Sequence, residues 1–215
     1  MHPRLLLPAL AVATVAQAQE PSPTYTVGPS GSHLYVVLRN DTSASLSRLG
    51  HDHVIYAKGF AAEVTWPTQP GGACSVSFSV PVRKLVVDPP GLRQRAGLDD
   101  NTIDDDDKQD LSKNMWGKSQ LWADEHPQIT FRSTSCPGGT GKVTVGGDLT
   151  IRGVAQPVSV ELQVAADGKA FAASGALTIT HTQFDFKPFA ASLFGPRNQD
   201  ELKLVVDVKG AVAGS

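Results

Sequence analysis

The sequence lacks a strong excess of charge of either sign. Lys and Arg together number 19 and Asp and Glu number 21, which gives a formal net charge of -2, and no basic block occurs. A chain of this kind is a poor partner for nucleic acid or for an anionic membrane surface, so we expect neither. It also lacks an uninterrupted apolar run of roughly 18 residues, so we expect no transmembrane segment in the mature protein.

Strong compositional bias is absent too. With 40% hydrophobic residues, 19% charged residues, 20 glycines and 15 prolines in 215 residues, the composition excludes collagen, coiled coil and wholesale disorder. The length suits one ordinary globular domain with appendages. No nucleophile stands in a context that suggests activation, and no cofactor fingerprint or dense acid/base cluster is present. We therefore expect a protein that is not an enzyme and that uses no cofactor.

The N-terminus has the pattern of a secretory signal peptide. Arg4 precedes an apolar stretch over residues 5–15, and a small-x-small sequence follows at residues 16–18. The alternative is an N-terminal helix of the domain, but Pro8 within the stretch and the helix-poor remainder of the chain disfavour it. We expect residues 1–18 to be removed and the mature protein to be periplasmic or secreted.

The chain has only two cysteines, Cys74 and Cys136. Each stands at one end of a strand-like run, and two cysteines in an oxidising compartment usually pair. We expect a Cys74–Cys136 disulfide, with two buried free thiols as the alternative. The bond would close a loop of about 60 residues and would stabilise the fold by about 4 kcal/mol in the chain-entropy description.

Hydrophobic and polar residues alternate over much of the chain, which is the period of half-buried β-strands. Residues 19–32, rich in Pro, Ser, Thr and Gly, are expected to form an N-terminal tether or a first edge. Eight strand-like runs follow it, over residues 33–38, 53–66, 74–80, 129–133, 143–151, 158–164, 171–180 and 202–209.

Short turns such as Arg152-Gly153 separate most of these runs, and short connections imply antiparallel neighbours. One helical insertion is expected over residues 108–122, where Leu111 and Met115 share a face, and we expect it to act as a lid or plug. Eight antiparallel strands with one helical insertion indicate a mainly β fold, either a closed barrel or a sandwich. A barrel of about eight strands is just wide enough to hold one small ligand.

Two histidines are candidates for a metal site. His51 and His53 would share one face of a strand, so both imidazoles could approach one ion, and His33 could complete the set. The alternative is a turn and strand start in which these histidines make structural hydrogen bonds. The acidic stretch over residues 99–110 lacks the spacing of a calcium-binding EF-hand loop, and we expect a solvated segment that leads into the helix.

Three segments together resemble the YceI-like family in order and spacing. Residues 46–50 followed by Gly59-Phe60 resemble an early strand pair of that family. Residues 126–133 resemble its Tyr-Pro-x-Ile-x-Phe-x-Ser segment, and residues 147–158 match its Gly-x-Leu-Thr-x-Arg-Gly-Val-x-x-Pro-Val stretch. The resemblance covers roughly residues 24–210 as a single domain.

The sequence also departs from that family. His126 replaces the common Tyr before Pro, and Leu111-Ser112 stands where members often carry an Arg-Asp pair. Residues 183–185 read Gln-Phe-Asp in place of the late Asp-Phe-Gly, and the Gly-His-x-His segment that ends at His53 resembles a subgroup feature. These changes bear on the identity of a ligand more than on the fold.

The resemblance implies a single eight-stranded, antiparallel, lipocalin-like barrel with one short helical insertion, exported to the bacterial periplasm. We expect this YceI-like domain over residues 33–210. The family further implies an elongated apolar tunnel for a polyisoprenoid or another amphiphilic lipid. The candidate wall residues, each of which could instead belong to an ordinary core, are Phe78, Met115, Trp116, Phe131, Leu149, Val160 and Phe184.

The leading hypothesis is therefore a non-enzymatic carrier or sequestering protein for a lipid-like molecule. The second hypothesis is a metal-binding or stress-related protein that uses His51 and His53, and the third is an enzyme such as a hydrolase. The alternation leaves open whether the apolar stripes fill a core or line a tunnel. It also leaves open whether the protein is a monomer or a homodimer.

Overall fold

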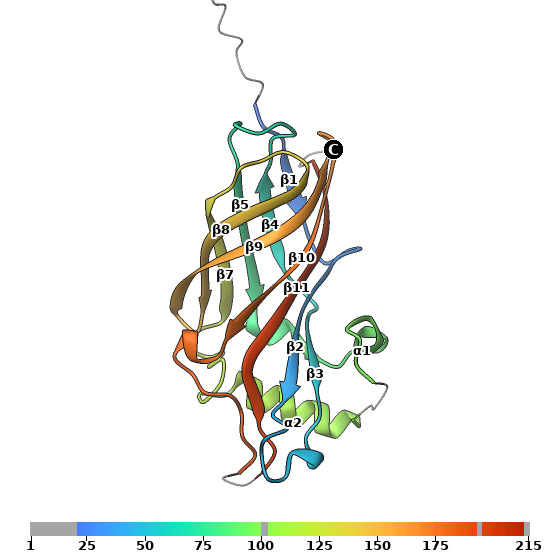
Figure 1. The fold of residues 1–215 in the computed structure, drawn as a ribbon, viewed down its shortest axis with the longest axis vertical. Coiled ribbons are helices and arrows are strands. Elements are labelled where there is room, and N and C mark those ends of the chain that lie inside the picture. The colour runs from blue at the N-terminus through green and yellow to red at the C-terminus, as the bar shows by residue number, and fades with distance from the viewer. Residues whose placement is uncertain (1–20, 100–102, 193–194, 213–215) are drawn as a thin grey trace, which may run out of the picture.

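A computed structural model describes residues 21–99, 103–192 and 195–212 (Figure 1). The expected signal peptide, residues 1–18, lies outside the described residues. The strands are β1 (Thr24–Val27), β2 (His33–Asn40), β3 (His53–Ala57), β4 (Ala61–Thr65), β5 (Ser75–Pro81), β6 (Leu85–Val87), β7 (Gln128–Ser135), β8 (Gly141–Ile151), β9 (Val154–Ala166), β10 (Ala170–Thr180) and β11 (Asn198–Val212). The helices are α1 (Leu92–Arg95) and α2 (Asp105–Trp116), and the 3-10 turns are η1 (Ser47–Leu49), η2 (Val82–Lys84) and η3 (Thr182–Phe184).

The strands form one antiparallel sheet that closes on itself. Eight of them pair in the ring order β1-β4-β5-β7-β8-β9-β10-β11, and a further pairing of β1 with β11 completes the ring. The expected eight-stranded antiparallel barrel is therefore confirmed. Successive strands pair as neighbours from β7 to β11, as short connections require.

At the end of the barrel nearer α2 (Figure 1), the sheet branches. The long strand β11 pairs with β1 through residues 210–212 and with β2 through residues 202–207. β2 continues through β3 to β6, so three extra strands extend the sheet beyond the ring. The pairing of β1 with β11 therefore closes the ring at the end away from α2. At the end nearer α2, β2, β3 and β6 widen the sheet.

The turn between β8 and β9 shows how local sequence sets this pairing. Arg152 and Gly153 both have positive φ, 54° and 76°, as the tightest hairpin turns require. A Cβ on Gly153 would come within 2.8 Å of Cε1 of His126, so only glycine fits without displacing that ring. The same turn lies in the stretch that carries the family resemblance.

Of the two expectations for residues 19–32, a tether or a first edge, the structure shows a strand over part of the segment. Thr24–Val27 forms β1, which pairs with both β4 and β11 and so closes the ring. Tyr25 and Val27 point inward and are 0% and 1% exposed. The barrel therefore begins at residue 24 rather than 33, because four alternating residues suffice for a strand when neighbours on both sides satisfy its backbone.

The helical insertion is present, with bounds that differ from residues 108–122. α2 begins at Asp105 because Asp104 caps it, accepting a 2.8 Å hydrogen bond from the Asp107 N–H. It ends before Gly117, whose φ and ψ are extended. The acidic residues therefore occupy the first turn of a helix, where negative charge interacts favourably with the helix dipole.

The two cysteines are joined in a disulfide, Cys74–Cys136, with a Cα–Cα distance of 5.6 Å. Cys74 precedes β5 and Cys136 follows β7, so the bond ties these strands at the end of the barrel away from α2. Near it, the Trp66 indole N–H donates a 2.6 Å hydrogen bond to the Gly139 carbonyl.

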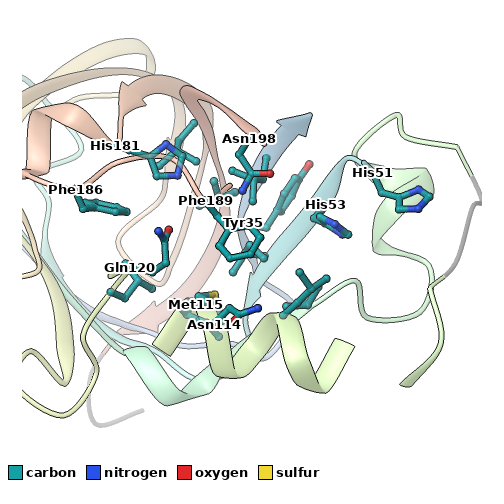
Figure 2. Close-up of a pocket in the computed structure, with 18 of the residues that line it drawn as sticks. Tyr35, His51, His53, Asn114, Met115, Gln120, His181, Phe186, Phe189 and Asn198 are labelled. Atoms are coloured by element: carbon teal, nitrogen blue, oxygen red, sulfur yellow. The ribbon is translucent and has the colours of Figure 1, made fainter. Parts of the chain in front are cut away.

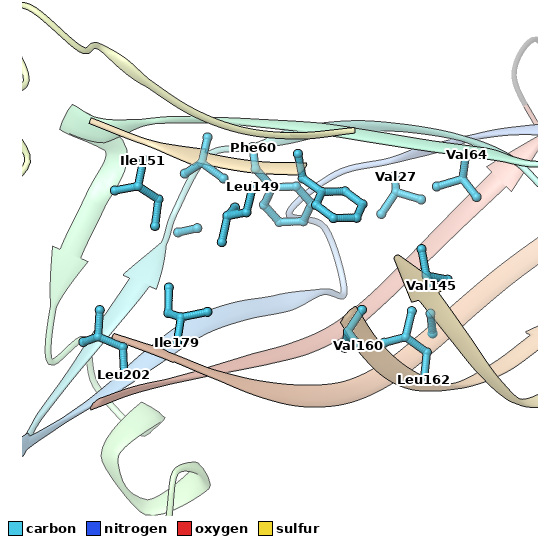
Figure 3. Packing of buried hydrophobic residues seen from close by; sticks show 14 of the residues in the cluster. Val27, Phe60, Val64, Val145, Leu149, Ile151, Val160, Leu162, Ile179 and Leu202 are labelled. Atoms are coloured by element: carbon cyan, nitrogen blue, oxygen red, sulfur yellow. The ribbon is translucent and has the colours of Figure 1, made fainter. Parts of the chain in front are cut away.

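Packed side chains fill the end of the barrel that carries the disulfide. Figure 3 shows one group of buried residues toward this end and another toward the opposite end. The first group is Val27, Val64, Val145, Val160 and Leu162, and the second includes Ile151, Ile179 and Leu202. Only residues of the second group border the space described next. The apolar stripes thus fill a core in one half of the barrel and line a cavity in the other.

Candidate ligand cavity

A cavity of about 430 Å³ lies between the branched end of the barrel and α2 (Figure 2). This volume falls in the range of about 300–1,000 Å³ that is typical of small-molecule sites. Its walls come mainly from β2, β3, β6, β11 and α2, with contributions from β5, β7, β8 and β10. The principal apolar lining residues are Leu34, Val36, Leu38, Ile55, Phe78, Val80, Leu85, Val87, Leu111, Met115, Leu121, Ile129, Leu149, Ile151, Ile179, Phe186, Phe189, Leu202 and Leu204.

Successive residues of β2 and β3 point to opposite faces of the sheet, and both faces are covered by apolar residues. Val36 and Ile55 are paired across the two strands and both line the cavity. The alternate residues Val37 and Val54 are also paired, and they belong to a separate cluster that includes Leu92 of α1. The α1 region thus covers the outer face of the branch and leaves its inner face to the cavity.

One face of α2 forms the opposite wall. Asp107, Asp110, Leu111, Asn114 and Met115 line the cavity, and they recur at the i, i+3, i+4, i+7 and i+8 spacing of a single helix face. This face is apolar toward the C-terminus of the helix and acidic toward its N-terminus. The cavity is therefore bounded by carboxylates along one part of its rim.

A buried ionic cluster fixes the orientation of His53 in the cavity wall. The Nδ1 atom of His53 lies 2.8 Å from Oδ2 of Asp88, whose other oxygen accepts a 2.7 Å hydrogen bond from the Val54 N–H. Arg93 contacts the same carboxylate at 3.2 Å and donates a 2.6 Å hydrogen bond to the Asp52 carbonyl. Burial raises the pKa of Asp88, but the hydrogen bonds from His53 and Val54 and the nearby positive charges outweigh it and lower the pKa below its ordinary value.

His181 forms a second polar position in the wall. Its ring is 4% exposed, packs edge-on against Phe186 and lies 2.8 Å through Nδ1 from the Asp200 carbonyl. A carbonyl can only accept, so Nδ1 carries the proton. Burial lowers the pKa of His181, although the contacts with Asp200 oppose this, and the ring is therefore neutral at pH 7.

The remaining polar lining is mostly uncharged. Asn40, Asn114, Gln120 and Asn198 present amides to the space. Of the lining residues in the described part of the chain, Arg197 is the one with a permanent positive charge. Its guanidinium lies 2.6 Å from Asp41.

Several hydrogen bonds hold the Asp41 carboxylate in the ion pair with Arg197. Hydrogen bonds from Ser43 and Arg197 lower the pKa of Asp41 to about 2. Arg197 is thus neutralised by Asp41, and Asp110 at the cavity rim is paired in the same way with Lys113, whose Nζ atom lies 2.7 Å from its carboxylate.

Three of the seven residues proposed as wall residues border this cavity: Phe78, Met115 and Leu149. Phe131 stacks on Phe78 with ring centroids 5.5 Å apart and is itself 6% exposed in the core. Val160 belongs to the filled half of the barrel. The structure therefore divides the seven candidates between the cavity and the core.

The other two candidates lie outside the lining as well. Phe184 is 0% exposed and sits in η3, which contacts β9 and β10. Trp116 follows Met115, and each residue of a helix is rotated by about 100° from the previous one, so it leaves the cavity face. It packs against the barrel core with the Arg83 guanidinium 5.6 Å from the centre of its ring.

His51 and His53 lie close together, with ring centroids 6.4 Å apart. The Nδ1 atom of His53 is engaged by Asp88, as described above. Across the residues that the structure describes, no group of three or more His, Cys, Asp or Glu side chains is arranged to hold a metal ion. The alternative interpretation, in which a histidine makes a structural hydrogen bond, fits the geometry of His53.

Sequence reasoning missed two kinds of cavity residue. The alternation Leu34-Val36-Leu38 and the helical spacing from Asp107 to Met115 are present in the sequence and could have identified two walls. His181, Phe186 and Phe189 carry no comparable signal, because an irregular segment after β10 brings them to the cavity.

Comparison with known proteins agrees with this architecture. A profile of the family described as YceI-like domain matches residues 25–210. The chain belongs to this family. The YceI-like match begins within β1, in agreement with the observed start of the barrel.

Individual relatives of this YceI-like protein are distant. It is 31% identical over 123 residues to the UPF0312 protein plu2095 of Photorhabdus laumondii, a match that covers 54% of this chain and 57% of that protein. The matched region thus spans little more than half the length of that relative.

Solved structures share the fold of the YceI-like chain. The crystal structure of Burkholderia cenocepacia BcnA matches with a TM-score of 0.60 and 22% identity, covering 85% of this chain and 98% of that one. The Campylobacter jejuni YCEI protein matches with a TM-score of 0.50 and 15% identity, covering 71% of this chain and 80% of that one.

Across the described residues, neither helix has the length and apolar character needed to span a bilayer.

Proposed function

We propose that this protein is an exported, non-enzymatic carrier that holds a polyisoprenoid or similar amphiphilic lipid. The observation that carries the proposal is the apolar cavity of about 430 Å³ between the barrel and α2. Export is supported by the N-terminal sequence pattern and by the disulfide, which is typical of oxidising compartments. A carrier role without catalysis is supported by the absence of an activated nucleophile in the sequence.

Apolar burial alone can supply useful affinity in such a cavity. Each buried methylene contributes about 0.8 kcal/mol, so ten of them contribute about 8 kcal/mol, which corresponds to a Kd of about 1 μM. The filled half of the barrel limits how deeply a chain can enter. Selectivity should therefore follow the length and shape of the hydrocarbon that fits between β2, β11 and α2.

Native mass spectrometry of protein purified from its own host without detergent tests the proposal. We expect a non-covalent adduct whose organic extract contains an isoprenoid or fatty chain. Protein that is empty in repeated preparations, and that also fails to bind added farnesol, would contradict the carrier role.

A matched pair of α2 variants locates the bound molecule. Met115→Glu places a carboxylate in the apolar wall and should abolish the adduct, because burying a charge there is costly. Gln109→Glu places the same charge on an exposed side chain of α2 that does not line the cavity, and should leave the adduct unchanged. Equal loss in both variants would indicate that the helix as a whole, rather than its cavity face, was disturbed.

A further inference from the structure

One turn at the edge of the cavity carries large apolar side chains that solvent reaches. Across the described residues, the large hydrophobic side chains that are exposed are Leu46, at 37%, and Leu49, at 58%. Both belong to η1 and its N-cap, in the loop between β2 and β3. Single apolar residues on a surface are ordinary, but these two come from one turn. Leu49 also lines the cavity, so the exposed turn stands at the cavity edge.

The 3-10 geometry of η1 aligns the two leucines. The Leu49 N–H donates a 3.0 Å hydrogen bond to the Leu46 carbonyl, and the Gly50 N–H donates a 2.9 Å hydrogen bond to the Ser47 carbonyl. Residues three apart in such a turn lie above one another. Leu46 and Leu49 therefore project from the same side of the turn and form a small apolar patch.

Hydrogen bonds from the surrounding loops hold this turn in place. The Asn40 side-chain amide donates a 2.7 Å hydrogen bond to the Ser47 carbonyl. The Asp41 N–H donates a 2.7 Å hydrogen bond to the Arg197 carbonyl, which joins this loop to the segment before β11. The patch is thus presented by a braced loop, and contact with a partner requires little further ordering of the chain.

The charges beside the patch match a phospholipid head group. Arg48 lies between the two leucines in sequence and is exposed. Arg39 and Arg197 are paired with Asp52 and Asp41, whereas Arg48 has no carboxylate partner within the part of the chain that the structure describes. A guanidinium binds phosphate through parallel hydrogen bonds, and every phospholipid carries a phosphate next to its apolar chains. Two leucines that flank an unpaired arginine therefore suit the boundary between the head groups and the hydrocarbon of a bilayer.

The position of the turn allows a flat surface to reach it. The loop between β2 and β3 lies at the extremity of the molecule beyond α2, opposite the end that carries the C-terminus (Figure 1). The acidic first turn of α2 is not far away, and the chain has no basic block. The contact should therefore depend mainly on the two leucines, with only a moderate contribution from anionic lipids.

We propose that Leu46, Arg48 and Leu49 form a docking site for the surface of a phospholipid membrane, through which the cavity receives and releases its ligand. The site rests on the proposed carrier function and specifies the partner with which the carrier exchanges its lipid. The leucines enter the head-group region while Arg48 contacts a phosphate. Because the patch is small, the contact is transient, as a carrier that returns to water requires.

Flotation of the intact mature protein with vesicles tests the docking site. We expect binding to phosphatidylcholine vesicles and a moderate increase when phosphatidylglycerol is added. Leu46→Asp should reduce the bound fraction about tenfold, because a carboxylate would have to enter the interface. Leu46 is the N-cap of η1, a position that favours Asp, so the turn should still form. Thr140→Asp adds the same charge to an exposed loop at the disulfide end and should leave binding unchanged.

A second variant separates the contribution of charge from that of the apolar patch. Arg48→Glu should weaken binding to vesicles that contain phosphatidylglycerol about tenfold, and should weaken binding to phosphatidylcholine vesicles less. Neither Leu46 nor Arg48 lines the cavity, so both variants should bind farnesol in vesicle-free solution as the unmodified protein does. Both should take up farnesol from preloaded vesicles more slowly than the unmodified protein, in proportion to their loss of vesicle binding.

The outcomes distinguish the docking site from the carrier function. If the unmodified protein binds no farnesol in vesicle-free solution, the carrier function fails. If farnesol binds but the protein floats with neither kind of vesicle, or if Leu46→Asp floats as well as the unmodified protein, the carrier function stands and the docking site is wrong. Sedimentation velocity supplies the remaining comparison. A dimer that Leu46→Asp converts to a monomer, with flotation unchanged, would assign the patch to a second copy of this chain.

Discussion

At the scale of single residues, the buried charges near the cavity are organised around Asp88. Its backbone has a positive φ of 43°, which places the carboxylate back against β3, where the Val54 N–H and the His53 ring both reach it. Arg93 is 5% exposed and contributes the opposite charge. Each member of this cluster depends on the others, because a buried charge without its partner is strongly destabilising.

Replacement of Asp88 should therefore cost far more than replacement of an exposed partner. We expect Asp88→Asn to lower the free energy of unfolding by about 3 kcal/mol, since Arg93 would lose its buried counter-charge and keep only the exposed carboxylate of Asp99. The control is Asp124→Asn, which breaks a surface pair with Arg83 and should cost less than about 1 kcal/mol. Urea unfolding followed by circular dichroism measures both, and similar losses in the two variants would contradict the assignment.

His181 should give the fold a specific dependence on pH. Because burial lowers its pKa below 6.5 in the folded state, the unfolded chain takes up a proton first as the pH falls. The stability contribution is complete above about pH 6.5 and declines below it, by at most about 1.4 kcal/mol per pH unit for one group. Burial raises the pKa of Asp200, which faces His181, but the hydrogen bonds that Asp200 accepts from Thr182 outweigh this and lower it, so Asp200 acts in the range below its ordinary value of 3.8.

Unfolding measured from pH 8 to pH 5 checks this dependence. His181→Asn retains a donor for the Asp200 carbonyl and cannot titrate, so its stability should vary less with pH over this interval than that of the unmodified protein. An identical slope in both proteins would show that another group is responsible.

At the scale of the secondary-structure elements, two adjacent residues of α2 differ in role: one lines the cavity and the other packs against the barrel core. Met115 borders the cavity and Trp116 packs on the barrel beside Arg83. Met115→Ala should weaken the binding of farnesol by about 1–2 kcal/mol with a small effect on stability. Trp116→Ala should instead lower stability by about 2–4 kcal/mol and leave the affinity of the folded protein unchanged.

Paired thermal melts and binding titrations of the two α2 variants test this division. The reverse result, in which Trp116→Ala loses affinity and keeps its stability, would place the tryptophan at the ligand. Melts with and without farnesol show in addition which variant still couples binding to stability.

Alternation in the sequence predicted most of the strands, because a half-buried strand must show one apolar face regardless of its neighbours. The run expected over residues 53–66 is divided in the structure into two strands, β3 and β4. The short strand β1 was not predicted by alternation, since Tyr25 and Val27 lie within a segment whose Pro, Ser and Gly content is typical of loops. The branch through β2, β3 and β6 was not predicted either. Local pattern does not reveal that β11 is long enough to pair with two strands on one edge.

The site was predicted less completely than the fold. Phe78, Met115 and Leu149 could be named because large apolar residues on inward faces are natural wall candidates, but the same property describes Phe131 and Val160 in the core. Which of them meets empty space depends on how the two ends of the barrel are filled. His181 comes to the cavity through tertiary placement of an irregular segment, which no sequence period describes.

At the scale of the whole molecule, the barrel has two ends with different tasks. The end away from α2 is closed by β1 (Figure 1). Packed side chains fill this end, and it carries the Cys74–Cys136 disulfide. The other end is widened by the β2-β3-β6 branch and holds the cavity. Stability and ligand binding should therefore be separable by changes made at opposite ends of one continuous sheet.

Removal of the disulfide tests this separation. The bond joins residues 62 apart in sequence, and a loop of this length stabilises a fold by about 2–4 kcal/mol. The double variant Cys74→Ser/Cys136→Ser should lower the melting temperature clearly, and treatment of the unmodified protein with a reductant should reproduce the shift. Farnesol affinity measured well below the melting temperature should stay within about twofold, since the packed half of the barrel separates the bond from the cavity. A large loss of affinity in a fully folded variant would mean that the two ends are coupled through β5 and β7, the strands that the bond ties and that also contribute Phe78 and Ile129 to the cavity wall.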